Sequence, residues 1–361
     1  MVKKRFSIAK IVKAPVKATG KVASSVGKPF DYMFKSLTKP ITLTLESGKN
    51  IYLKKREVKN QPGVNFVHYF GFDDKDMSKK PPYFVLATLM HKLSSFEESS
   101  LCKLIGQEQK TLLTLNHKGI EKAFGPVVKS EWDLRGKFNQ RAYFVFEYLD
   151  CCSLKSIYNS EDNMLLKNKL KIIQELSEVV DYLHTPTLNK PIVYHRNLNP
   201  DNIVLQKNKR QTVKLVNFKD AVFLEPGTSA NDQIENSFNE LTTYEYLAPE
   251  RVPKKRGKEW MNAKSEIYSL GIICYELLAR FHPFDNYYVL NSDFFDNILR
   301  SIGEKYIFLI RGKSNDHYKP LKMRKDAHIY PSGLIEVIEA SLEHNWKNRP
   351  TAEEFLTNVN W

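Results

Sequence analysis

The chain has 361 residues, of which 42% are hydrophobic and 12% aromatic, so it can bury a substantial core. Its formal net charge is +14, its four cysteines are too few and too scattered for a disulfide framework, and no run approaches the roughly 20 apolar residues of a membrane span. The charge is uneven, because residues 1–30 contain eight lysines and arginines and no acid, which leaves +6 for the remainder.

Residues 1–40 form a basic segment that differs from the rest of the chain. Apolar residues recur in it at helical spacing, but Pro15 and Pro29 interrupt both stripes. Three interpretations are open: a solvated tail, an amphipathic segment attracted to an anionic membrane surface, and a mitochondrial presequence, for which the segment has too much lysine and too little arginine. We expect no nucleic-acid partner, because aromatic residues are not interleaved with the basic ones.

From about residue 41 the pattern changes to short β-rich runs, followed by mainly helical stretches. The predicted strands are "NIYLKKREV", "GVNFVHYFGF", "PPYFVLATLM" and "AYFVFEYL", and "EESSLCKLIGQEQKTLLTL" is a predicted helix between the last two. The later predicted helices are "LLKNKLKIIQELSEVVDYLHT", "KSEIYSLGIICYELLARF", "SDFFDNILRSI", "PSGLIEVIEASLEH" and "TAEEFLTNV". A sheet-rich part before a helix-rich part predicts an α+β protein with two lobes, at about 45–149 and 150–361.

Several short motifs follow one another along this part of the chain. They are "VFEYLDCCSL" at 145–154, "HRNLNPDN" at 195–202, "VKLVNFKDA" at 213–221, "TTYEYLAPE" at 242–250, "EIYSLGIICYELL" at 266–278 and "NRPTAEEFL" at 348–356. Together they resemble the signature set of the protein kinase family, in the same order and at similar distances. The resemblance covers roughly residues 45–361 and implies a bilobal protein-kinase-like fold, with a small β-rich lobe before a larger helical one.

The positions that hold such a fold together keep suitable residues. His195 and Arg196 open the segment that resembles the catalytic loop, and Glu266 replaces an aspartate that caps this loop in the family, with its charge retained. Arg349 is expected to form a bidentate ion pair with Glu250, which would tie the activation segment to the last helices. These five residues are therefore predicted to be structural.

The positions that carry the chemistry are altered. The resemblance places the family's catalytic aspartate at Asn197, and an amide is not a base near neutral pH. It places the loop lysine at Asn199, the metal-binding aspartate at Asn217 and the following glycine at Lys219. Only Asn202, the second metal ligand of the family, is retained. Because the base and the metal ligand are both absent, we predict that the chain has lost phosphate transfer but retains the fold.

The first lobe also lacks residues that the family uses to bind the nucleotide. Its phosphate loop should be glycine-rich, but "REVKNQPGVNF" supplies only Gly63. The resemblance places the helix glutamate at Glu108, whereas the partner lysine corresponds to Thr88 or, if the strand is shifted, to Lys92. The apolar alternation around Thr88 favours the first assignment.

The hinge that follows is expected to hold any nucleotide base. Phe146 is the predicted gatekeeper, and the backbone from Glu147 to Leu149 would face an adenine edge.

These observations predict a pseudokinase, which is a kinase-like scaffold or regulator that acts by binding proteins. Two alternatives are open: a divergent active serine/threonine kinase, and a membrane-tethered adaptor that acts through residues 1–40. We expect no catalytic residue, no metal site and no required cofactor, and at most weak ATP binding that does not depend on Mg²⁺. A cytoplasmic location, with attachment to a membrane surface as an option, fits the composition; the sequence does not identify the protein partner.

Overall fold

The computed structural model describes residues 41–55, 67–77, 81–89, 96–132, 138–160, 164–207, 212–224, 244–251, 262–284 and 320–359. These residues fall into two compact units, and each is described by itself. Of the described residues, the first unit contains those from 41 to 116 together with 121–150, and the second contains 117–120 and those from 151 onward. The predictions for residues 1–40, Gly63, Lys92, the helix at 292–302 and the activation segment at 225–243 lie outside the described residues.

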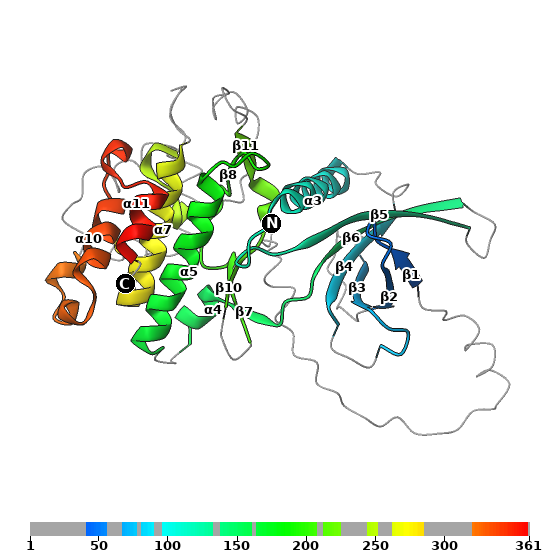
Figure 1. Ribbon diagram of the computed structural model, residues 1–361, viewed down its shortest axis with the longest axis horizontal. Coiled ribbons are helices and arrows are strands. Elements are labelled where there is room, and N and C mark those ends of the chain that lie inside the picture. Colours follow the sequence, from blue (N-terminus) through cyan, green and yellow to red (C-terminus); the bar gives the residue numbers. More distant parts are fainter. Residues whose placement is uncertain are drawn as a thin grey trace, which may run out of the picture. The chain divides into compact units, whose positions relative to one another are not determined.

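The first unit is a six-stranded antiparallel sheet with one helix against it (Figure 1). Its strands pair in the order β1-β2-β3-β4-β6-β5, and helix α3 packs against β5 and β6. The elements are β1 (Ile41–Thr44), β2 (Asn50–Lys55), β3 (Val67–Phe72), β4 (Tyr83–Leu89), α3 (Phe96–Thr114), β5 (Ala123–Trp132) and β6 (Phe138–Glu147).

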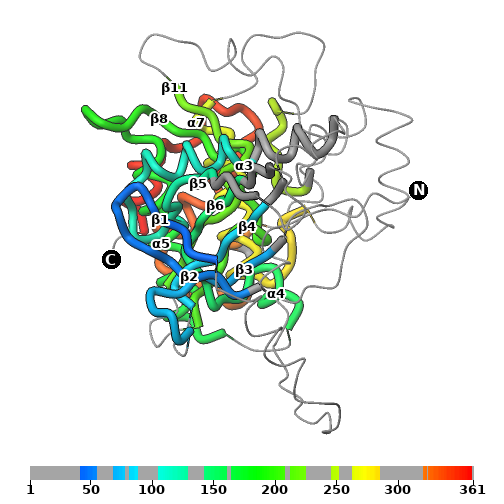
Figure 2. Tube along the Cα trace, turned by 90° about the vertical axis from the view of Figure 1, so that its right-hand side faces the viewer, coloured from blue at the N-terminus to red at the C-terminus, as the bar shows by residue number. Residues whose placement is uncertain are grey.

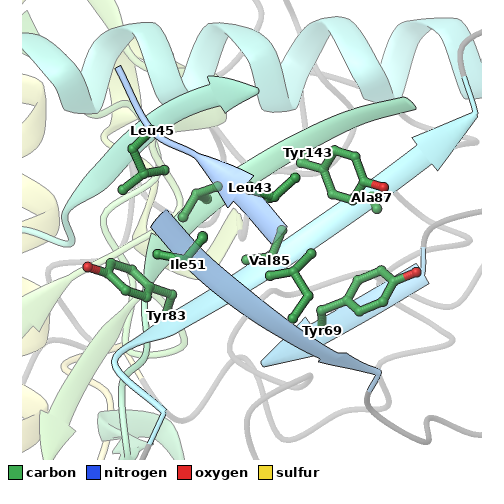
Figure 3. Close-up of a cluster of buried hydrophobic side chains, with 10 residues drawn as sticks. Leu43, Leu45, Ile51, Tyr69, Tyr83, Val85, Ala87 and Tyr143 are labelled. Atoms are coloured by element: carbon green, nitrogen blue, oxygen red, sulfur yellow. The ribbon is translucent and has the colours of Figure 1, made fainter. Parts of the chain in front are cut away.

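One face of this sheet encloses a hydrophobic core. On β4, alternate residues Tyr83, Val85 and Ala87 point to this face, and each is at most 4% exposed. Figure 3 shows them gathered with Leu43 and Ile51 from the first two strands. The period of two along each strand therefore sets the pairing register, because a slip of one residue would turn this core toward the opposite face.

Strand β5 was not among the predicted strands, and its sequence explains why. Gly125 has a φ of +86°, which favours glycine, and Pro126 follows it. The pairing with β6 shifts register between Ala123 and Pro126, which is a bulge. A glycine and a proline inside a run normally indicate a turn, so the pattern concealed a ten-residue strand.

The second unit is mainly helical, with short strands around its loops. Its strands and longer helices are β7 (Cys151–Ser153), α4 (Leu154–Tyr158), α5 (Leu166–His184), β8 (Ile192–Tyr194), β9 (Ile203–Gln206), β10 (Val213–Leu215), β11 (Val222–Leu224), α7 (Ala263–Ala279), α10 (Ser332–Ser341) and α11 (Ala352–Val359). Single-turn 3-10 helices include η2 (Phe218–Asp220), η3 (Tyr244–Tyr246) and η4 (Pro249–Arg251).

Helix α7 is the central helix of this unit. From Ser265 to Ala279 every side chain except that of Ser269 is buried, as expected for a helix that is apolar on nearly all sides. Its first turn is closed by a capping box between Asn262 and Ser265. A Cβ atom at Gly271 would lie 2.7 Å from the Cβ atom of Ser341, so only glycine allows α10 to approach this closely.

Candidate functional site

Two short strand pairs position the segment at 195–202. It begins directly after β8 and ends directly before β9. Strand β8 pairs with β11 so that Tyr194 faces Val222, and β9 pairs with β10 so that Ile203 faces Leu215. The β8–β11 pair is visible in Figure 2. Both ends of this segment are therefore held beside both ends of residues 216–221, although the two segments are separate in the sequence.

His195 is a neutral residue inside this loop. Its Nδ1 accepts the backbone N–H of Asn197 at 3.3 Å, so its Nε2 carries the proton that is donated to the carbonyl of Val216 at 3.2 Å. The ring stands edge-on to that of Phe218, with 4.7 Å between the centroids. Burial lowers the pKa of His195, in agreement with a neutral ring whose two nitrogen atoms both have partners.

Glu266 on α7 caps the start of the loop, as expected from the sequence. Its Oε1 accepts the backbone N–H of Arg196 at 2.5 Å, and its Oε2 lies 2.8 Å from Nε2 of His184. Arg196 has a φ of +64°, a left-handed conformation that is strained for arginine, and this cap helps to hold it. Burial disfavours the charged form of Glu266, but the hydrogen bond and charge of His184 outweigh it, so the pKa of Glu266 lies below its usual value.

The side-chain amides of the loop bind one another. The backbone N–H of Asp201 donates to Oδ1 of Asn199 at 2.9 Å, which fixes the orientation of that amide. Nδ2 of Asn199 therefore faces Asn197, where it donates to Oδ1 at 2.7 Å and to the backbone carbonyl at 3.0 Å. The position of the family's catalytic aspartate thus has its side-chain oxygen engaged by the position of the family's lysine.

A second chain of amides includes the two metal-ligand positions of the family. Asn202 donates from Nδ2 to the carbonyl of Asn197 at 2.8 Å, so its Oδ1 faces Asn217 and accepts the Nδ2 hydrogen at 2.9 Å. This leaves Oδ1 of Asn217 buried with no hydrogen-bond partner among the described residues. Asn217 has a φ of +73°, which asparagine adopts more readily than most residues.

Asp220 lies beside Asn197 and was not among the residues predicted from the motifs. Its Oδ2 accepts the Nδ2 hydrogen of Asn197 at 3.3 Å. A signal was present, because "NFKDA" contains an acid three residues after Asn217. Lys219, which lies between Phe218 and Asp220, is half-buried, and no hydrogen bond described among the loop amides involves it.

Arg251 is a second residue that sequence analysis overlooked. It is 7% exposed, and its Nη1 donates to the backbone carbonyl of Arg196 at 3.0 Å. Burial and the charge of Arg196 lower its pKa to about 10, so it is still a cation at neutral pH. The loop therefore lies against two buried cations.

The expected ion pair between Glu250 and Arg349 is present. Nη1 of Arg349 lies 2.7 Å from Oε1 of Glu250, and Nη2 lies 2.9 Å from Oε2, which is a bidentate arrangement. Ser265 donates a further hydrogen bond to Oε1 at 2.8 Å. The guanidinium also lies over the ring of Tyr268, 4.7 Å from its centroid.

In the sheet unit, the structure places the remaining predicted site residues on β4, α3 and β6. Thr88 is opposite Ala142 in the strand register, and Glu108 on α3 is fully buried. Phe146 is 3% exposed and pairs with Phe84.

The backbone of the predicted hinge is partly engaged within the chain. The N–H groups of Glu147 and Tyr148 donate to the carbonyls of Lys122 and Pro82, both at 2.9 Å. Leu149, the last residue of the hinge, is buried. Two of the donors expected to face an adenine edge are therefore already used.

Within the described parts of the chain, no group of three or more histidine, cysteine or acidic side chains could hold a metal ion. The helices described also include none that is long and apolar enough to cross a membrane.

Comparison with known proteins agrees with this architecture. The sequence matches the protein kinase domain over residues 86–360. A Drosophila melanogaster protein, named as like mitogen-activated protein kinase kinase kinase 7, is 24% identical over 266 residues, which are 73% of this chain and 57% of that protein. An Aurora kinase of Eremothecium gossypii is 25% identical over 266 residues, 67% of each chain.

A bacterial relative matches over a shorter region. The serine/threonine-protein kinase PknB of Mycolicibacterium smegmatis is 29% identical over 142 residues, which are 39% of this chain. The chain spans 57% of the length of the fly relative and 20% of this bacterial one. The matched region includes the end of β4, all of β5 and β6, and the α-helices described above, so the fold is that of a protein kinase, with a sheet-rich N-terminal part and a helical C-terminal part. The chain belongs to the protein kinase family.

Proposed function

We propose that this chain is a pseudokinase, a kinase-fold protein that does not transfer phosphate and acts by binding other proteins. The observation that carries the proposal is the chain of hydrogen bonds that joins Asn197, Asn199, Asn202 and Asn217. Fold and chemistry are separate questions, and here the amides at the chemical positions bind one another instead of facing a substrate.

The proposal is supported first by the absence of a catalytic base at position 197. A kinase needs a carboxylate to accept the proton of the substrate hydroxyl, and this assistance is typically worth about 10²–10⁴ in rate. Asn197 cannot accept a proton near neutral pH, and both ends of its amide are engaged, by Asn199 and by Asp220. It can therefore neither deprotonate nor orient a hydroxyl group without breaking these contacts.

The proposal is supported next by the poor match between the site and the ligands that Mg²⁺ prefers. Mg²⁺ prefers carboxylate oxygens in near-octahedral geometry, and the family uses an aspartate and an asparagine together. Here the aspartate position is Asn217, and the retained oxygen of Asn202 faces an N–H group of Asn217. Among the loop amides described, the buried oxygen with no partner is Oδ1 of Asn217, which is uncharged. The donor set therefore does not fit Mg²⁺.

The sheet unit supports weak nucleotide binding at best. With Thr88 at the lysine position, the family's Val-Ala-Ile-Lys strand reads Val-Leu-Ala-Thr, so the small alanine is replaced by the buried Leu86. An uncharged residue at 88 also removes the cation that would contact phosphates.

We expect any ATP binding to be independent of Mg²⁺. In a thermal-shift titration of the full chain, the melting temperature should rise equally, or not at all, with Mg²⁺ and with a chelator. A ligand at 100 times its dissociation constant stabilises a protein by about 2.7 kcal/mol, so binding would be readily seen. An active protein kinase run in parallel provides the positive control, and a shift of this chain that needs Mg²⁺ would argue that Asn202 and Asn217 do hold a metal.

A second candidate function, a divergent active serine/threonine kinase, is favoured by one observation. Asp220 places a carboxylate 3.3 Å from the amide that replaces the catalytic aspartate. In this candidate Asp220 would accept the proton of the substrate. Phosphate transfer that is lost in Asp220→Asn would favour it over the pseudokinase, whereas no transfer by either form favours the pseudokinase.

A further inference from the structure

We propose that Asn197 and Asp220 are an exchanged pair, in which one position carries the acid and the other the amide, here 220 and 197, so that the two positions cannot both be acidic. Asp220 is then a positioning residue that accepts from Asn197 and holds that amide in the orientation imposed by Asn199. The proposal does not depend on whether the chain transfers phosphate.

The orientation of the Asn197 amide is imposed by its neighbours. The backbone N–H of Asp201 orients Asn199, whose Nδ2 then points at Oδ1 of Asn197. Nδ2 of Asn197 must therefore point the other way, where it meets Oδ2 of Asp220 at 3.3 Å. A rotated amide would place its oxygen against the carboxylate and its N–H group against the N–H group of Asn199.

Charges around the pair favour one carboxylate at this place. Arg196 is 7% exposed, and its Nη1 lies 3.5 Å from the backbone carbonyl of Asp220. Burial lowers the pKa of the Arg196 guanidinium, and the negative charge of Asp220 opposes this. Arg251 of η4 is buried next to Arg196, so two cations at the loop need acidic neighbours. The acids that act on Arg251 are Glu266, Glu250, which is also paired with Arg349, and Asp220.

The consequence is a specific incompatibility. An acid at 197 would put a carboxylate oxygen where an N–H group now faces Asp220, in a site where 197 is 6% exposed. Two carboxylates at hydrogen-bond distance repel each other strongly in such surroundings. In the double variant, the amide at 220 donates to the carboxylate at 197, and Asn199 still donates to the same carboxylate. Restoring the family's aspartate at 197 alone is thus expected to damage the loop.

The test is a double-mutant cycle on the full chain, with unfolding by urea followed by circular dichroism. The four forms are the wild type, Asn197→Asp, Asp220→Asn and the double variant. We expect Asn197→Asp to raise the unfolding equilibrium constant at least about tenfold in the wild-type background, a coupling within the range for contacting residues. In the Asp220→Asn background the same change should cost nothing or stabilise the protein.

A matched control separates this charge exchange from general damage to the loop. Asn202 is 2% exposed, and its side chain donates to the backbone carbonyl of Asn197 and accepts from Asn217, so its described contacts do not involve the side-chain amide that faces Asp220. The cost of Asn202→Asp should therefore be the same, within about threefold, with Asp220 or with asparagine at 220.

Two outcomes would overturn the proposal. One is an equal cost of Asn197→Asp in both backgrounds. The other applies if Asn197→Asp does not fold. In that case, a double variant that also fails to fold, although Asp220→Asn folds, would show that the positions are not exchanged. A folded double variant would then support the pair. None of these results depends on phosphate transfer, so failure of the pair and failure of the proposed function are distinguishable.

Discussion

Replacing Arg349 with alanine is expected to lower the free energy of unfolding by about 3–5 kcal/mol, because the change removes a fully buried guanidinium and leaves the carboxylate of Glu250, whose side chain is only 13% exposed, without its cation. All five N–H groups of Arg349 have acceptors. Two meet Glu250, and the others donate to backbone carbonyls at 2.7–3.1 Å, those of Glu343, Lys264 and His344. Equilibrium unfolding in urea measures the loss.

Two further variants show whether the geometry or only the charge matters. Arg349→Lys keeps the charge but cannot form the bidentate contact, so most of the loss should remain. Lys118→Ala breaks the ion pair with Glu178, in which the lysine side chain is 73% exposed, and should cost less than about 1 kcal/mol. Equal, small losses for Arg349→Ala and Lys118→Ala would contradict the buried-pair account.

Replacing Glu266 with glutamine is expected to cost roughly 3 kcal/mol at neutral pH. The change removes the anion that accepts from Arg196 and His184, in a region where Arg251 is also buried. Unfolding in urea at several pH values provides the measurement.

The stabilisation by Glu266 is expected to depend on pH. The pKa of Glu266 in the folded protein lies below its usual 4.5, so the carboxylate stabilises the fold above that value. This stabilisation is lost as the pH falls through the folded-state pKa. The difference between wild type and Glu266→Gln should therefore be full near pH 7 and shrink below pH 4.5. A difference that stays constant down to strong acid would show that the charge of Glu266 is not what stabilises the loop.

The sequence was informative where a pattern is local. Periods of two and of about 3.6 identified β2, β3, β4, β6, α3, α5, α7, α10 and α11. The strands of the second unit are only three or four residues long, too short to show a period, and Gly125 and Pro126 concealed β5. The likeness of the motifs to kinases did predict the family and the ion pair between Glu250 and Arg349.

The arrangement of the amides could not be derived in this way. The motifs showed that carboxylates are absent at 197 and 217, but not where the amides would turn. Asn217 meets Asn202 fifteen residues away, and Asp220 meets Asn197 twenty-three residues away, because the pairings of β8 with β11 and of β9 with β10 align the two segments. Long-range contacts of this kind depend on register, which a single local pattern does not encode.

The central claim, that the amides at the chemical positions have ended phosphate transfer, is tested most directly by a radiolabelled phosphotransfer assay. The purified full chain is incubated with Mg²⁺ or Mn²⁺, ATP and a generic substrate, beside Asn202→Ala as the matched variant. We predict neither autophosphorylation nor substrate labelling above that variant. Labelling by the wild type that Asn202→Ala abolishes would contradict the account, because it would require a working metal site at the retained ligand.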